Sequence, residues 1–222
     1  MPKTVRDSPG LTETDRLETF CDGVFAIAIT LLVLEIRGPA EPVVSGAGGL
    51  FPALATLWPS YLGYAISFVT LGIMWANHHS IFAYVRRADR NFLMINVLFL
   101  MFVSFLPFPT RVLAEHLTDP HERRDAVAFY SATLFVIALA YNAVWRYGVA
   151  GGRLLGPEAD PEGIRTISRR YWVGPFGYGL SFVLAFIVPW TSLVVHGLLA
   201  ALFALPERKP TPRQTRRSAA AT

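Results

Sequence analysis

The sequence predicts an all-α integral membrane protein with six transmembrane helices, and three observations lead to this fold class. Apolar residues make up 53% of the chain and charged residues only 16%, whereas a soluble domain carries about a quarter charged residues. Several apolar stretches approach or exceed the roughly 18 residues needed to cross a bilayer. The basic residues lie in short clusters between these stretches, which is typical of membrane loops and not of a nucleic-acid-binding surface. The expected partner is therefore the lipid bilayer, and no nucleic acid is expected.

The six expected helices follow from apolar stretches and from the prolines and glycines that interrupt them. The uncharged stretch 171–206 would form a helix of about 54 Å, too long for a hydrocarbon core of about 30 Å. We therefore expect two short helices there, separated at Pro189 and Trp190. The expected helices cover residues 14–36, 52–84 (with Pro59 as an alternative start), 91–106, 125–145, 168–188 and 190–205. The intervening segments 37–52, 111–124 and 146–170 are expected to be loops.

The distribution of arginine and lysine predicts the orientation. With the N-terminus in the cytoplasm, sixteen of the twenty basic residues fall on the cytoplasmic side, as the positive-inside rule requires. This places residues 1–13 in a cytoplasmic N-terminus and residues 14–205 in the six-helix transmembrane domain. The basic segment 206–222 is expected to be a disordered cytoplasmic tail. No cleavable signal peptide is visible, and the expected location is the plasma membrane, crossed several times.

Several kinds of chemistry are not expected. Cys21 is the single cysteine, so the chain can form no internal disulfide and no cysteine metal cluster. His78 and His79 are adjacent and point about 100° apart on a helix, so they do not form an i, i+4 zinc pair. No hydrolase, phosphate-loop or dinucleotide motif is present. We therefore expect no enzyme activity, no cofactor and no bound metal.

Two motifs in the first two helices resemble a known family. The first helix contains the run Asp22-Gly-Val-Phe-Ala-Ile-Ala-Ile-Thr30, and the second contains Trp75-Ala-Asn-His-His-Ser-Ile-Phe82. Both resemble signatures of the bacterial TMEM175 potassium channels, with Cys21 in the place of the family's serine. The resemblance implies a homotetramer around a central pore that is lined by the first helix of each subunit. It also implies potassium ions as the permeant species and an apolar constriction in place of a carbonyl filter.

The residues of the first helix allow this pore but do not require it. Ile27, Leu31 and Leu34 are spaced i, i+4, i+7 and share one stripe of the helix. On spacing alone, such a stripe is usually core packing or lipid contact. The resemblance assigns these three residues to the pore constriction, where apolar rings can gate by dewetting. Glu35, near the outer end, is interpreted either as a pore-mouth carboxylate or as a glutamate that faces the lipid headgroups.

Polar residues near the inner end of the first helix form a second candidate site. Asp22 lies within or near the membrane, where ionisable groups usually have partners. The candidate partners are Arg16, Trp75, His78 and His79, and the resemblance implies a polar network that ties the first helix to the second. A proton relay through Asp22 and the histidines is the alternative.

The sequence favours a potassium-permeable channel over two rival functions. One rival is a proton- or cation-coupled secondary transporter that uses Asp22, His78 and His79 as titrating groups. The other is a membrane scaffold without its own permeation. The segment Gly177-Tyr178-Gly179 is similar to part of a carbonyl filter, but Thr-Val does not precede it and a filter role is not expected.

Overall fold

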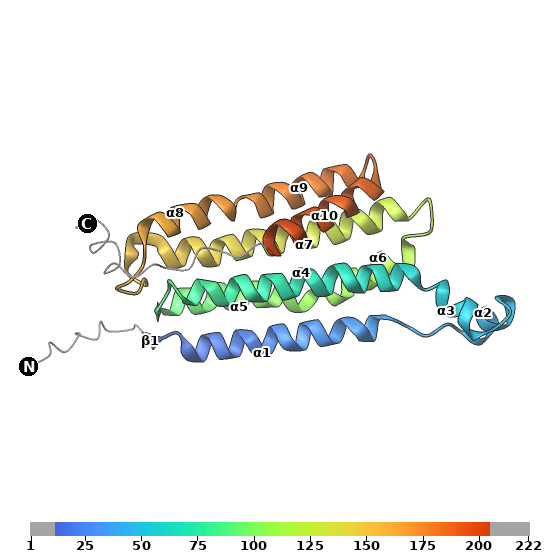
Figure 1. The fold of residues 1–222 in the computed structure, drawn as a ribbon, viewed down its shortest axis with the longest axis horizontal. Helices are drawn as coiled ribbons and strands as arrows, with labels where there is room; N and C mark the ends of the chain where they lie inside the picture. The colour runs from blue at the N-terminus through green and yellow to red at the C-terminus, as the bar shows by residue number, and fades with distance from the viewer. Residues whose placement is uncertain (1–11, 205–222) are drawn as a thin grey trace, which may run out of the picture.

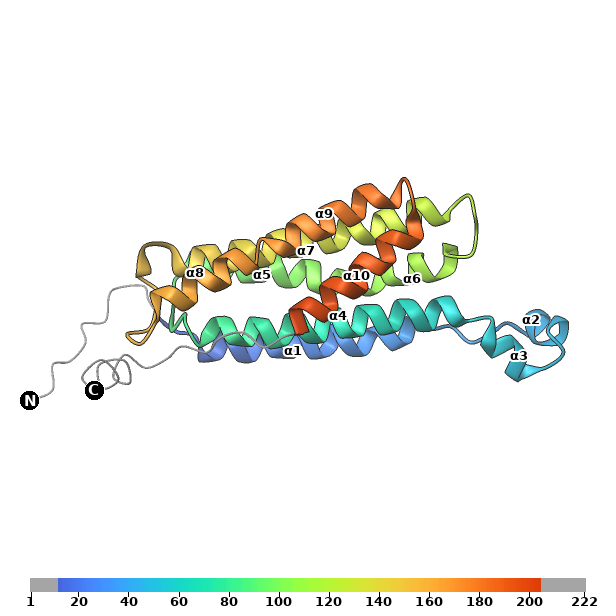
Figure 2. The ribbon, with the colours of Figure 1, turned by 45° about the horizontal axis from the view of Figure 1, so that its top comes forward.

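Long helices run alternately up and down the length of a bundle in the computed structural model, which describes residues 12–204 (Figure 1). The second view shows α10 crossing from α9 toward α4 (Figure 2). The long elements are α1 (Asp15–Leu31), α4 (Trp58–Phe82), α5 (Arg90–Phe105), α6 (Pro107–His116), α7 (Arg123–Val149), α9 (Val173–Ala185) and α10 (Pro189–Ala204). Of the expected N-terminal segment 1–13, residues 1–11 lie outside the described residues, and so does the whole expected tail 206–222.

Short elements connect the long helices at both ends of the bundle. At the end where α1 begins, β1 (Thr12–Glu13) pairs antiparallel with β2 (Arg87–Ala88), which ties the start of α1 to the α4–α5 connection. The remaining short elements are η1 (Leu32–Glu35), α2 (Glu41–Gly46), α3 (Leu50–Ala55), η2 (Ala150–Gly152) and α8 (Pro161–Arg170).

The segment 37–52, expected to be a loop, is partly helical. Helices α2 and α3 occupy much of the connection between α1 and α4, and Figure 1 shows them beyond the end of the bundle. The turn between them contains Gly48 and Gly49, with φ angles of 82° and 140°. These angles lie in a region that favours glycine, because a Cβ would be strained there. The prediction of a loop was therefore wrong for the middle and the end of this segment, where short helices form.

The third helical segment continues beyond its expected end at Leu106. A residue before proline usually leaves the helical region, but Leu106 keeps helical angles of −57° and −33°. Pro107 then occupies the first turn of α6, where its missing N–H costs nothing. As a result, the helical path reaches His116, and the expected loop 111–124 begins several residues late.

The segment 146–170, expected to be a turn-rich loop, also contains helix. Helix α7 extends to Val149, and α8 covers the last ten residues of the segment. The Asp160 side chain caps α8 by accepting hydrogen bonds from the amides of Glu162 and Gly163. Helix α9 accordingly begins at Val173, later than the expected start at residue 168.

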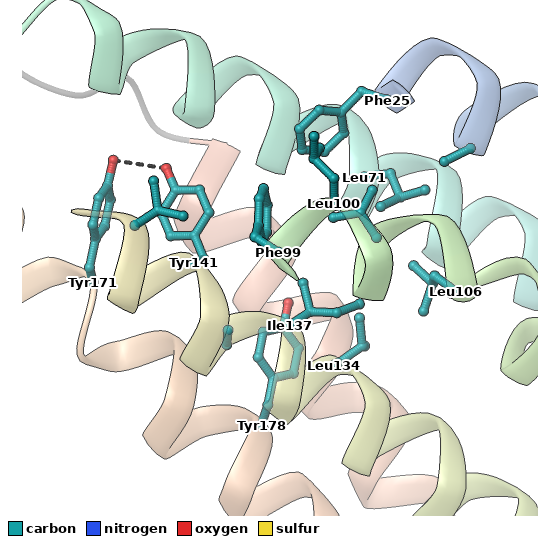
Figure 3. Packing of buried hydrophobic residues seen from close by; sticks show 14 of the residues in the cluster. Phe25, Leu71, Phe99, Leu100, Leu106, Leu134, Ile137, Tyr141, Tyr171 and Tyr178 are labelled. Carbon is teal, nitrogen blue, oxygen red and sulfur yellow. Dashed lines mark hydrogen bonds between the residues drawn. The ribbon is translucent and has the colours of Figure 1, made fainter. Parts of the chain in front are cut away.

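The core of the bundle is built around α7, which contacts α5, α6, α8, α9 and α10. Figure 3 shows Phe99 of α5, Ile137 of α7 and Tyr178 of α9 converging in this core, where all three side chains are buried. The hydroxyl of Tyr141 donates a hydrogen bond to the Tyr171 hydroxyl at 3.0 Å (Figure 3). Aromatic side chains thus hold α5, α7 and α9 together.

Within residues 12–204, three helical stretches are long and apolar enough to cross a membrane. They cover Asp15–Glu35, Arg90–His116 and Arg123–Gly152. Helix α4 adds 25 residues that include no aspartate, glutamate, lysine or arginine. Many large apolar side chains, such as Phe176 and Ile187, are exposed on the bundle, and lipid would cover such a surface. The fold is therefore that of a helical multi-pass membrane protein.

Candidate functional site

Helix α1 has two faces with opposite environments. One face packs into the bundle against α4 and α5. Its buried side chains are Leu17, Cys21, Phe25 and Ala28, and Leu32 continues this face in η1. On the other face, Ile27, Leu31 and Leu34 are 60%, 39% and 69% exposed. The described part of the subunit therefore covers only one side of α1 and leaves the predicted constriction stripe on its outer surface.

The last turn of this segment changes the register of the stripe. Residues 32–35 form the 3-10 helix η1, in which side chains three residues apart lie above one another. Leu34 consequently lies almost directly above Leu31, so the two side chains are better aligned than on a regular α-helix. Glu35 is rotated about 120° away from Leu31, and not the roughly 40° that an α-helix gives. Its side chain is half-buried.

Two polar contacts join α1 to α4 near the inner end of the bundle. The Trp75 indole Nε1 donates a hydrogen bond to Asp22 Oδ1 at 2.8 Å. One helical turn away, His79 Nδ1 lies 2.6 Å from Glu18 Oε1. Because the two helices are antiparallel, a step of four residues on each brings the next pair into contact. We call these two pairs the α1–α4 ladder.

His78 belongs to a different environment from its neighbour. Its ring is fully buried, and its Nε2 lies 3.1 Å from Asn96 Oδ1 of α5. The rings of Phe25 and Phe99 contact it, with centroids 5.6 Å and 5.4 Å away. His78 thus packs in the aromatic core between α1, α4 and α5, whereas the His79 side chain is mostly exposed and faces Glu18.

The structure brings together only some of the residues that the sequence grouped. Asp22 and Trp75 are bonded to each other, but the two histidines have other partners. Arg16 is exposed, and no partner for it occurs among residues 14–204, whose side chains are described. Sequence reasoning missed Glu18 and Asn96. Glu18 could have been found from its spacing, since it lies four residues before Asp22 on the same helix face.

The segment that is similar to a carbonyl filter is part of a regular helix. Gly177, Tyr178 and Gly179 lie inside α9. Their carbonyl groups therefore point along the helix toward backbone amides. A Cβ at Gly177 would come within 2.6 Å of Leu199 Cδ2, so this glycine permits close packing of α9 against α10.

Residues 16–107, which extend from α1 through α5, match the family model described as endosomal/lysosomal potassium channel TMEM175. A protein named as a potassium channel from Streptomyces collinus is 42% identical over 210 residues, which cover 95% of this chain and 99% of that protein. The human protein named endosomal/lysosomal proton channel TMEM175 is 30% identical over 185 residues, which cover 81% of this chain but 34% of the human protein.

A solved structure shares the fold. The crystal structure of a homolog of the lysosomal potassium-selective channel TMEM175 from Chamaesiphon minutus aligns with a TM-score of 0.79 and 43% identity. The alignment covers 86% of this chain and 96% of that one. The fold and the two-faced first helix thus define a multi-pass helical membrane protein built like a channel subunit. Given the extent of the sequence match, the chain belongs to the TMEM175 family.

Proposed function

We propose that the chain forms a potassium-permeable channel in which ions move passively and no covalent chemistry occurs. The observation that carries this proposal is the exposed apolar stripe of α1, because a pore needs a surface that the subunit itself leaves uncovered. The names of the Streptomyces collinus relative and of the Chamaesiphon minutus structure support potassium as the permeant ion.

The proposed assembly is a homotetramer in the plasma membrane, with six spans in each subunit. The spans are α1, α4, the continuous pair α5 and α6, α7, α9 and α10. Both termini would be cytoplasmic, and the positions of arginine support this orientation. Nine arginines belong to the segments at the end where α1 begins: Arg16, Arg86, Arg87, Arg90, Arg146, Arg153, Arg165, Arg169 and Arg170.

In the proposed pore, Ile27, Leu31 and Leu34 form stacked apolar rings, one residue per subunit in each ring. A narrow apolar passage empties of water and forces an ion to shed part of its hydration. Glu35 would provide a ring of carboxylates near the outer mouth, and the field of such a ring concentrates cations whichever way each side chain points.

The α1–α4 ladder supports the pore helix in this proposal and does not contact the ions. The ladder contacts of Asp22 and Glu18 go to α4, while the stripe faces away from the subunit. The two contacts of the α1–α4 ladder fix the rotation of α1 about its helix axis. That rotation decides which side chains of α1 face the pore.

Recording from purified protein in a planar bilayer tests the proposal. Under a potassium/sodium gradient, a channel gives unitary current steps and a reversal potential near that of potassium. A coupled transporter that uses Asp22 and the histidines gives no unitary steps, and a scaffold gives no current. Because the vertebrate relatives are named proton channels, a second recording under a pH gradient separates proton current from potassium current. A reversal potential that follows pH alone would overturn potassium permeation.

A further inference from the structure

A cavity inside the subunit, away from the exposed face of α1, has no role in the proposed permeation. It lies between α4, α7, α9 and α10. Met74 of α4, Tyr141 and Asn142 of α7, Tyr178 of α9 and Phe203 of α10 contribute to its wall.

Two buried polar atoms in the wall have no hydrogen-bond partner within the described part of the chain. Thr70 and Asn142 are only 3% and 5% exposed, and the Thr70 hydroxyl and Asn142 Oδ1 are both unsatisfied. The Asn142 amide nitrogen donates to the carbonyls of Ala138 and Tyr171. These two acceptors fix the amide orientation, so the oxygen must be the unpaired atom. Unsatisfied buried polar groups are rare and call for a ligand or water.

The chemistry of the wall favours an uncharged ligand with a hydroxyl group. No residue that lines the cavity carries a charge, so a carboxylate or phosphate headgroup would be desolvated without compensation. A hydroxyl group both donates and accepts. It can donate to Asn142 Oδ1 and exchange a second hydrogen bond with Thr70.

An apolar groove on the surface of the bundle adjoins this cavity. The groove lies between α4 and α10, and it shares Ile73 and Ala200 with the cavity. Its other lining residues are also small or aliphatic: Ala65, Ile66, Val69, Gly197, Ala201 and Ala204. Figure 2 shows α10 converging on α4 along this side of the bundle. Such a groove fits one hydrocarbon chain, and the bilayer would supply that chain laterally.

We infer that the cavity and its groove form a binding site for a neutral single-chain lipid that carries a hydroxyl headgroup. The hydroxyl group occupies the cavity between Thr70 and Asn142, and the hydrocarbon chain follows the groove between α4 and α10. This site is separate from the pore proposed above, so its test does not depend on ion conduction.

Photolabelling of the full-length protein in lipid nanodiscs tests the inference. The probe is a long-chain primary alcohol with a diazirine in its hydrocarbon chain, and peptide mapping by mass spectrometry locates the label. We expect labelling of peptides from α4 and α10. An excess of 1-hexadecanol should suppress it, whereas hexadecane and palmitate should not. The proposed site would be contradicted by labelling of other peptides, by no labelling, or by equal competition from hexadecane. No labelling and equal competition are both consistent with a cavity that holds only water.

Two matched threonine variants distinguish a loss of ligand binding at this site from a general effect on packing. Thr70→Val removes an unpaired hydroxyl, so the affinity for 1-hexadecanol should fall about threefold to tenfold. The melting temperature should stay equal or rise, because no protein hydrogen bond is lost. Thr133→Val is the control, since the Thr133 hydroxyl donates to Phe129 of its own helix outside the cavity. Unchanged affinity in Thr70→Val, or an equal loss in both variants, would contradict the inference.

Discussion

Helices α7 and α1 are both apolar enough to span a membrane, yet their surroundings differ strongly. In the 18-residue apolar stretch of the α7 segment, 61% of the residues are buried inside the subunit. In the corresponding stretch of the α1 segment, 28% are buried. Helix α7 is surrounded by helices of its own chain, and its side chains serve the stability of the bundle. Within the described part of the chain, helix α1 packs mainly against α4 and α5. An apolar helix left uncovered in this way is available for contacts with other subunits or for lining a pore.

Truncation of one isoleucine on each helix gives the largest expected difference, which is in the free energy of unfolding. Ile137 of α7 is fully buried, whereas Ile27 of α1 is 60% exposed. We expect Ile137→Ala to lower the free energy of unfolding by about 2–5 kcal/mol, because it leaves a cavity in the core. Ile27→Ala leaves no cavity within the subunit and should cost under about 1 kcal/mol. Chemical unfolding of both variants in mild detergent measures the difference, and equal costs would contradict the two-faced description of α1.

A tryptophan pair on α4 tests the α1–α4 ladder with a smaller effect. Trp75→Phe leaves the Asp22 carboxylate without its indole donor and should cost about 1–3 kcal/mol of stability or assembly. Trp58→Phe is the control, since Trp58 is equally exposed on the same helix and stacks on Trp190. Folded yield and oligomer size are measured by size-exclusion chromatography. If Trp75→Phe assembled normally but changed ion selectivity, the ladder would belong to the permeation path.

Glu35 tests whether the outer end of the α1 segment faces a shared mouth. Glu35→Gln should lower single-channel conductance by about twofold in dilute salt, and by much less in concentrated salt, where screening shortens the reach of the charge. Conductance measured over a series of potassium concentrations gives the comparison. A loss of the same size at every concentration would exclude this field effect.

The smallest expected effect concerns Asp89, which caps α5 at the inner end of the bundle. Partial burial raises the pKa of its carboxyl, but hydrogen bonds from the Phe92 amide and the Tyr147 hydroxyl lower it. An ion pair with Arg153 lowers it further, and the net pKa lies below the usual value. The ionised carboxylate therefore stabilises the fold at pH values above about 4. This contribution is lost as the pH falls through the lowered pKa of the folded state.

Asp89→Asn isolates that contribution, because asparagine also caps helices well. The variant should be slightly less stable than the parent at pH 7 and should lose less stability as the pH falls below about 4. Thermal melting over this pH range measures the slope. A parent protein whose stability rises as the pH falls through this range would contradict the assignment.

Much of the helix pattern could be predicted from the sequence, because proline and apolar length are local signals. The start of α1 at Asp15, the proline in the first turn of α4 and the break before α10 at Pro189 all agree with expectation. The continuation through Pro107 could not be predicted, because it depends on buried contacts of α6 with α7. Helix α8 was missed because it is short and polar, and its stability comes from a cap and from packing.

The candidate site also has a part that the sequence could predict and a part that it could not. The stripe of Ile27, Leu31 and Leu34 follows from helical spacing, so the sequence could group these residues. Glu18, the partner of His79, could have been found from its spacing before Asp22. The partner of His78 could not be deduced, because only the packing of α4 against α5 brings Asn96 close to it. Adjacent histidines therefore have unrelated environments.

Single-channel recording of Leu31→Asn tests the central claim, that the exposed stripe of α1 lines the pore. A polar side chain at this ring should keep the constriction wet, which raises conductance and weakens discrimination between potassium and sodium. Leu180→Asn on α9 is the control, because Leu180 is also exposed but lies on another helix; buried Leu32 is unsuitable, since its truncation damages the core. The account predicts a change in Leu31→Asn alone. Equal effects in both variants, or none in either, would contradict it.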